Sequence, residues 1–347
     1  MYNLEALRQQ LPSTPVPCTK VNWPAAQHDA FQRIDERSLE WAERQGLLLD
    51  DKHRERAKRL AVGSFSCRVY PNASEAFIQI MADYLLWFYV IDDLYVDRVD
   101  TINDDTVRNL TAVIDIMDLL ELKPDSPFGA APFLNLCLRL KDMVPVECFE
   151  RWAEGMRLWA FAGSLMILGE SRPGACKLPQ YEVIRRYLSG VMPFVACSDY
   201  ANGGNAITSS EFYDNNVQKL VRFVCNITAW SNDNDSLAAE LYQPGQQMNM
   251  TILRACENGF NLREAVQYTD SRVRTEIEEY ERVQAEVLGK ASDALRGYCL
   301  GLQHWISGFR DWVEFDTCRY DAKFAIEECD DRGLVHIAQA VAQAVSV

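Results

Sequence analysis

Apolar residues recur at intervals of three and four positions along most of the chain. This spacing is typical of α-helices that turn one face toward a core. Prolines, glycines and asparagines separate the periodic stretches, and no stretch shows the strict alternation that indicates a β-strand. The pattern therefore predicts an all-α protein. The expected helices cover about residues 27–47, 52–69, 74–97, 103–122, 130–144, 146–170, 179–200, 212–240, 247–258, 261–289, 291–316 and 332–345.

Prolines interrupt the start of the chain between residues 12 and 24. Proline removes a backbone donor and breaks helices, so residues 1–25 are expected to form an extended N-terminal arm. The rest of the chain contains no internal repeat, low-complexity tract or long Gly/Ser linker. Residues 26–347 are therefore expected to fold as a single α-helical domain.

The segment 75–93 has hydrophobic side chains on almost every face of a helix. Such a helix belongs at the centre of a bundle. It ends in Asp92 and Asp93, although buried carboxylates are costly unless they are paired or bind a metal. The sequence thus predicts a single-domain bundle whose central helix delivers acids to one end.

Composition narrows the possible functions. The chain of 347 residues has a net charge of −15 and 48% hydrophobic residues. Its acidity argues against nucleic acid or an anionic membrane as partner, so an anionic ligand would need metal ions or well-placed arginines. The eleven cysteines include no Cys-x-x-Cys pair and the four histidines are scattered, which argues against zinc and disulfides. No stretch is long enough to span a membrane and no secretory signal is present, so a cytoplasmic location is expected.

The first candidate metal site is the sequence DDLYVD, which contains Asp92, Asp93 and Asp97. Asp93 and Asp97 are one helical turn apart, and Asp92 is rotated by about 100° from Asp93. Carboxylates this close repel one another and need cations, and Mg²⁺ prefers such oxygens. A frayed, solvated helix end would carry similar residues, but the apolar helix leading into the cluster favours a functional site.

The second candidate site is the sequence NDNDSLAAE, which begins at Asn232. Asn232, Ser236 and Glu240 follow at intervals of four and therefore share one helix face. An amide oxygen, a hydroxyl and a carboxylate suit one hard cation. A calcium-binding EF-hand loop is excluded because Ala238 occupies the position that requires glycine. A helix cap or turn is the structural alternative for so many Asn, Asp and Ser residues.

The two clusters, in this order and at this separation, resemble those of microbial class I terpene synthases. That family carries an aspartate-rich motif of the form D-D-x-x-(x)-D/E and, much later in the chain, N/D-D-x-x-S/T-x-x-x-E. The resemblance covers about residues 68–320. It implies a single-domain helical bundle of the class I terpenoid synthase type around a central apolar cavity.

Two further motifs fit the family. Its diphosphate-sensing arginine stands about 46 residues before the asparagine of the second motif, with a glycine four residues later at a helix break, and Arg186 and Gly190 occupy these positions. A C-terminal Arg-Tyr pair corresponds to Arg319 and Tyr320. The resemblance implies that all four residues act in catalysis and that the two arginines and the tyrosine bind diphosphate. The neighbouring Arg185 is expected to point elsewhere, in a salt bridge.

Two positions depart from the family pattern. Val96 stands where the shorter first motif has its third acid, so Asp97 is expected to serve, as in the longer form. Ala239 replaces a lysine that often precedes the glutamate. This second change removes one diphosphate contact but leaves the metal ligands in place.

The resemblance implies a terpene cyclase, a lyase that ionises a linear isoprenyl diphosphate and cyclises the resulting carbocation. Three Mg²⁺ ions are expected, two held by Asp92 with help from Asp97 and the third by Asn232, Ser236 and Glu240. Metal ions and arginines would neutralise the charge that develops on the leaving diphosphate. Farnesyl diphosphate is the favoured substrate and geranylgeranyl diphosphate is possible.

The cation also needs an inert wall with aromatic faces, each contributing about 0.5–2 kcal/mol. Phe88 and Tyr89 precede the first acid cluster by one turn, and Trp312 precedes the Arg-Tyr pair. These three residues are expected to line the cavity, although aromatic residues on central helices often serve only as core.

Two other functions remain open at this point. A chain-elongating trans-prenyltransferase would share the fold and substrate class but would need a second D-D-x-x-D, where residues 232–236 read NDNDS. A non-catalytic acidic helical scaffold would leave the two clusters and Arg186 without a common purpose. The expected partner is a small-molecule diphosphate, and the protein is expected to be a monomer or homodimer.

Overall fold

A computed structural model describes residues 4–96, 104–172, 174, 176–242 and 248–321, so the expected helix over 332–345 lies outside the described residues. Within these ranges the chain forms helices and no β-strand, which confirms the all-α prediction. The helices are α1 Leu4–Gln10, η1 Leu11–Ser13, α2 Phe31–Arg44, α3 Asp51–Lys58, α4 Val62–Val69, α5 Glu75–Tyr95, α6 Asp104–Leu119, α7 Ala130–Met143, α8 Val146–Ser171, α9 Leu178–Leu188, α10 Val191–Val195, α11 Ser198–Ala201, α12 Ser209–Phe212, α13 Asn215–Asp235, α14 Leu237–Tyr242, α15 Met250–Glu257, α16 Leu262–Leu288 and α17 Asp293–Phe315.

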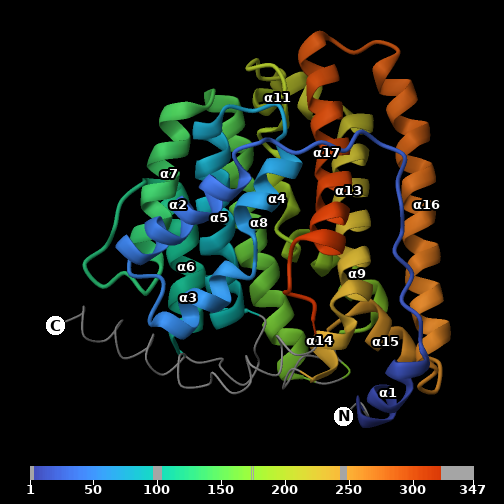
Figure 1. The fold of residues 1–347 in the computed structure, drawn as a ribbon. Helices are drawn as coiled ribbons and strands as arrows, with labels where there is room; N and C mark the ends of the chain where they lie inside the picture. Colours follow the sequence, from blue (N-terminus) through green and yellow to red (C-terminus); the bar gives the residue numbers. More distant parts are fainter. Residues whose placement is uncertain (1–3, 97–103, 173, 175, 243–247, 322–347) are drawn as a thin grey trace.

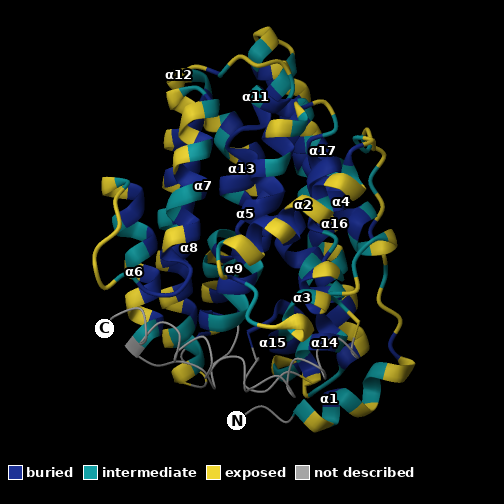
Figure 2. Ribbon diagram, turned by 60° about the vertical axis from the view of Figure 1, so that its left-hand side comes forward, coloured by how far each residue is buried: buried dark blue, intermediate teal, exposed yellow. Residues whose placement is uncertain are grey.

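Helix α5 lies inside the bundle and packs against α2, α4 and α7 (Figure 1). The Ser74 side chain caps its first turn by accepting a hydrogen bond from the Phe77 backbone. Its side chains are buried on nearly all faces, as the apolar run predicts. Buried residues gather on the inward faces of the surrounding helices, with exposed ones outside (Figure 2). None of the described helices combines the length and apolarity needed to span a bilayer.

Helices α13 and α17 form the other side of the bundle, where α13 packs along α16 and α17 packs against α4. Asp214 caps α13 by accepting from the backbone of Asn216 and Val217. Ser292 caps α17 by accepting from the backbone of Leu295. These caps fix the starts of two long helices whose other ends reach the candidate site.

Some expected helices are broken where close packing requires it. The stretch 52–69 becomes α3 and α4, joined at Ala61, which has a φ of 54°. Helix α4 approaches α2 so closely that a Cβ atom on Gly63 would lie 2.4 Å from the Asp35 backbone nitrogen. The Asp35 carboxylate accepts a hydrogen bond from the Gly63 backbone at 2.7 Å. Periodicity alone does not reveal such a break, because both halves keep the helical pattern.

The N-terminal arm is not extended throughout, because α1 and η1 occupy its first described residues. The prolines begin only at Pro12, which leaves the preceding turns free to form a helix. Leu7 is 0% exposed and packs with Leu237 and Leu241 of α14 in a small second core. Arg8 Nε donates a hydrogen bond to the Leu241 carbonyl at 2.6 Å. The arm therefore begins by holding the outer face of α14.

After η1 the chain runs alongside α16 (Figure 1). Thr19 donates a hydrogen bond to Asp270 at 2.6 Å, and the Trp23 indole donates one to Glu281 at 3.1 Å. This part of the arm has no regular secondary structure. It crosses from α1 to the start of α2 along the outside of the bundle.

Candidate active site

The bundle contains an open cavity, and the space within it, together with the solvent at its mouth, amounts to about 1090 Å³. Asp92 from α5, Asn232 from α13 and Glu240 from α14 line it, together with Arg319 and Tyr320 after α17. The two motif-bearing helices, far apart in sequence, thus meet at one cavity. Most of the remaining wall is formed by apolar side chains, among them Leu85, Phe88, Leu188, Phe194, Trp305 and Phe309. The cavity therefore combines a charged end with an apolar interior.

At the first acid cluster, Asp93 is bound by both terminal nitrogens of Arg319, at 3.0 and 2.6 Å. The same guanidinium lies over the Tyr89 ring, 4.2 Å from its centroid. Burial is the largest single influence on Asp93 and raises its pKa, but the charge and hydrogen bonds of Arg319, together with the charges of Arg56 and His53, outweigh burial and hold the pKa below its ordinary value. Asp92 lines the cavity, whereas Asp97 lies outside the described residues.

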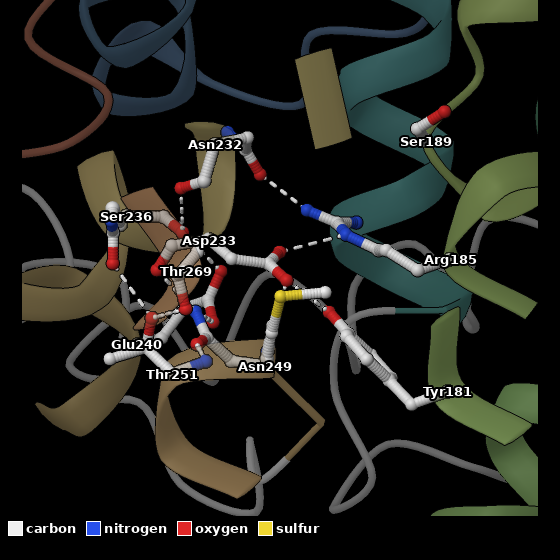
Figure 3. A network of polar contacts seen from close by, with 12 residues as sticks. Tyr181, Arg185, Ser189, Asn232, Asp233, Ser236, Glu240, Asn249, Thr251 and Thr269 are labelled. Atoms are coloured by element: carbon white, nitrogen blue, oxygen red, sulfur yellow. Dashed lines mark hydrogen bonds and ion pairs between the residues drawn. The ribbon is translucent and has the colours of Figure 1, made fainter. Parts of the chain in front are cut away.

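At the second motif, Asn232, Ser236 and Glu240 form a hydrogen-bonded row (Figure 3). The Ser236 hydroxyl lies 2.6 Å from the Glu240 carboxylate and 2.7 Å from the backbone carbonyl oxygen of Asn232. Asn249 donates to the other Glu240 oxygen at 2.9 Å. Burial, followed by repulsion from Asp233, raises the pKa of Glu240 to about 7. A cation placed beside Glu240 would favour its ionised form.

The donor atoms at this end are oxygens of the kinds that Mg²⁺ prefers: two carboxylates, an amide and a hydroxyl, from Asp92, Glu240, Asn232 and Ser236. Among the described residues, no cluster of three or more His, Cys, Asp and Glu side chains is arranged to hold a metal. The donor set therefore does not form an all-protein metal cage. It fits Mg²⁺, which commonly takes its remaining ligands from water and phosphate.

Asp233 stands inside the second motif but does not line the cavity, and it is 1% exposed. Its carboxylate accepts hydrogen bonds from the Tyr181 hydroxyl at 2.8 Å and the Met250 backbone at 3.0 Å on one oxygen. The other oxygen accepts from Arg185 Nε at 2.9 Å (Figure 3). Asp233 thus anchors the end of α13 to α9 and to the start of α15.

The structure corrects the expectation for Arg185, the neighbour of Arg186 on α9. Arg185 lines the cavity and also donates to the side-chain oxygen of Asn232, whereas Arg186 does not line the cavity and donates to Asn226 at 3.0 Å. The reason is helical geometry: Tyr181 and Arg185 are one turn apart on the face that meets Asp233. The expected salt bridge of Arg185 exists, but it holds the guanidinium at the cavity instead of removing it.

Gly190 forms the expected helix break, between α9 and α10, with a φ of +69°. Glycine is favoured there for two reasons. The left-handed backbone disfavours other residues, and a Cβ atom would lie 2.5 Å from the Phe88 ring. Ser189 and Val191, on either side, line the cavity. Gly190 therefore allows the chain to bend closely around Phe88.

Phe88 and Tyr89 line the cavity as predicted, but the prediction for Trp312 is wrong. Trp312 is 0% exposed, and its indole donates to the Leu60 carbonyl at 2.9 Å. Its ring stacks on Tyr89 with centroids 6.2 Å apart and meets Tyr320 edge to face at 5.9 Å. Trp312 therefore supports two lining residues from behind.

Several lining residues were not predicted. Thr228 lies one turn before Asn232, and Leu85 lies two turns before Asp92, so extending each motif backwards along its helix face would have found them. Phe65, from α4, and Phe194, from α10, reach the cavity only through the packing of the bundle. No motif marks them.

Comparison with known proteins identifies the family of the chain. Residues 83–279 match the family described as terpene synthase family 2, C-terminal metal binding. A sesquiterpene synthase from Metarhizium brunneum is 43% identical, over 95% of this chain and 96% of the relative. A farnesyl diphosphate-cyclizing (+)-corvol ether B and A synthase from Kitasatospora setae is 40% identical, over 89% of this chain and 96% of the relative. The SVS_A2 protein from ancestral sequence reconstruction shares the fold, with a TM-score of 0.79, 20% identity and coverage of 87% and 90% of the two chains.

The fold and the charged end of its apolar cavity define a class I terpenoid synthase bundle. The chain belongs to the terpene synthase family. This confirms the family resemblance and excludes the scaffold alternative, whereas the roles of individual site residues stay predictions.

Proposed function

We propose that this terpene synthase is a Mg²⁺-dependent cyclase of farnesyl diphosphate. The observation that carries the proposal is one cavity in which oxygen ligands and arginines meet an apolar, aromatic wall. The names of the Metarhizium brunneum and Kitasatospora setae relatives, one a sesquiterpene synthase and one a farnesyl diphosphate-cyclizing enzyme, support a C15 substrate.

Asp92 and Asp97 would hold two Mg²⁺ ions, and Asn232, Ser236 and Glu240 would hold a third. When bound, these ions supply positive charge that offsets the charge developing on the diphosphate as it leaves. Because the chain has a net charge of −15, such cations would also reduce its repulsion of an anionic substrate.

Arg185, Arg319 and Tyr320 would bind the diphosphate at the cavity mouth. A guanidinium matches phosphate oxygens with paired donors, which makes both arginines suitable. Arg319 is paired with Asp93 and Arg185 with Asn232, so diphosphate would draw each guanidinium away from a residue of a metal-binding motif. Arg186, bonded to Asn226 outside the cavity, would have at most a supporting role.

The apolar wall would fold the isoprenyl chain and exclude bulk water from the carbocation. Phe88 and Tyr89 offer aromatic faces close to the charged end, where the cation forms. Phe194 and Trp305 extend the aromatic wall, with ring centroids 5.0 Å apart. Such walls contribute shape and cation–π stabilisation without a nucleophile that would trap the cation.

The direct test is incubation of the purified protein with farnesyl diphosphate and Mg²⁺, with products analysed by gas chromatography and mass spectrometry. Cyclic C15 products that depend on Mg²⁺ and disappear with EDTA are expected. Geranyl and geranylgeranyl diphosphate serve as length controls. Longer linear diphosphates, formed only when isopentenyl diphosphate is added, would instead identify a chain-elongating prenyltransferase.

A further inference from the structure

A polar side chain, that of Thr228, interrupts the apolar wall of the cavity. Thr228 lines the cavity from α13, one turn before Asn232. It is therefore about 6 Å from Asn232 along the helix axis, toward the start of α13. Its neighbours along the wall are apolar and include Ala229, Phe194 and Trp305. The hydroxyl is therefore positioned beside the hydrocarbon part of a bound substrate, one helical turn from the charged end of the cavity.

The Thr228 oxygen is held in place by Trp305. The Trp305 indole nitrogen donates a hydrogen bond to Thr228 Oγ1 at 3.1 Å. The indole is itself fixed by Phe65, edge to face with centroids 5.2 Å apart, and by Phe194 at 5.0 Å. One lone pair of the Thr228 hydroxyl oxygen thus accepts a hydrogen bond from a rigidly held donor. This bond restricts the directions of the hydroxyl hydrogen and of the second lone pair.

The Thr228 hydroxyl can still donate one hydrogen bond and accept another. Among the described residues, the Thr228 hydroxyl donates no hydrogen bond, and the side chain is only 6% exposed. Buried hydroxyls normally find a partner in protein or ordered water. The hydrocarbon chain of an isoprenyl diphosphate offers none, so a water molecule is the natural partner inside the cavity.

We propose that Thr228 holds a water molecule that adds to the cyclised carbocation, so that the enzyme releases a terpene alcohol. The water oxygen forms a new C–O bond with the cationic carbon by donating a lone pair. The resulting oxonium then loses a proton to the diphosphate released in the first step, and no oxidant or reductant is needed. This inference rests on the proposed cyclisation of farnesyl diphosphate.

The test begins with the wild-type enzyme, farnesyl diphosphate and Mg²⁺ in water enriched in oxygen-18. The main product is expected to be an alcohol, or an ether formed from it, that carries the heavy isotope. Hydrocarbons as the only products would overturn the inference while leaving the cyclase function intact. Absence of diphosphate release would overturn the proposed function and, with it, this inference.

Three variants then test Thr228 itself. Thr228→Val keeps the side-chain shape and is expected to raise the ratio of hydrocarbon to alcohol by roughly tenfold or more, with total diphosphate release within about fivefold of wild type. Thr228→Ser is expected to retain the alcohol. Ser189→Ala removes a different lining hydroxyl, one that donates to the Arg186 backbone carbonyl. This variant is also expected to form the alcohol product. An unchanged alcohol fraction in the valine variant would refute the role of Thr228.

Discussion

The side-chain nitrogen of Asn232 donates a hydrogen bond to the Tyr320 hydroxyl at 2.9 Å, across 88 residues of sequence. With the pairs Arg185–Asn232 and Arg319–Asp93, this bond connects the residues proposed to bind diphosphate to the metal-binding motifs. If these residues bind metal and diphosphate as proposed, the two ligands are expected to replace these internal bonds with bonds of their own. Because each ligand releases a partner for the other, the two are expected to bind together more tightly than separately.

The choice between Arg185 and Arg186 can be tested with matched lysine substitutions. Arg185→Lys retains a positive charge near buried Asp233 but loses the planar fork, so kcat/KM for diphosphate release is expected to fall roughly 100-fold. Arg186→Lys is expected to lower it by less than about tenfold. Steady-state kinetics, with thermal unfolding to check the fold, measures both. A larger loss for the Arg186 variant would restore the sequence-based assignment.

The proposed metal ligands can be tested by Asp92→Asn and Asn232→Ala. Each is expected to lower turnover of farnesyl diphosphate by roughly 100-fold or more, because developing charge on the leaving group would lose stabilisation. The apparent Mg²⁺ requirement should also rise, as read from rates across a magnesium titration. Asp115→Asn is the control, since Asp115 pairs with Lys123 outside the cavity. Full activity in either ligand variant would reject the assignment.

Gly190 allows two physical effects to be separated. Gly190→Ala is expected to destabilise the protein in urea by about 1–2 kcal/mol from left-handed backbone strain, and by about 1–3 kcal/mol more from overpacking against Phe88. Gly204→Ala is the control, because Gly204 has a similar φ of +73° but a Cβ atom added there would meet nothing within 4 Å. Equal destabilisation of the two variants would show that contact with Phe88 contributes nothing.

Leu7 tests the contact between α1 and α14. Leu7→Ala removes a fully buried side chain, a change that costs about 2–5 kcal/mol in well-packed cores. Because its core is separate from the main one, the loss is expected locally, as faster amide hydrogen exchange in α14 with little change in α5. Val16→Ala, in the same arm but 39% exposed, should leave exchange unchanged. Unchanged α14 exchange in the Leu7 variant would contradict the contact's importance.

Most of the helical bundle could be predicted from the sequence, because apolar periodicity directly reflects which faces are buried. Breaks were harder to predict. Gly190 could be recognised through its motif, whereas the break at Ala61 arises from the close contact between Gly63 and Asp35 on another helix. The helix α1 was missed because its stability depends on Leu7 packing against a segment more than two hundred positions away.

The site could be predicted where spacing along one helix decides which side chains point together. That reasoning brought Asn232, Ser236 and Glu240 to one cavity. It failed for Arg185, because sequence spacing does not show which face of α9 meets Asp233. It also failed for Trp312, whose position depends on the Leu60 carbonyl in a different part of the chain.

The buried position of Asp233 affects how an activity screen of this enzyme should be interpreted. Substitution of Asp233 is expected to lower activity as much as substitution of Asn232, because residues of α9 and α15 donate hydrogen bonds to its carboxylate at the end of α13. The defect would nevertheless be architectural, visible in denaturation curves and in lost arginine alignment. Under the proposed function, two adjacent positions of one short motif serve different purposes, Asn232 the chemistry and Asp233 the scaffold, and a screen that does not measure folding would not distinguish them.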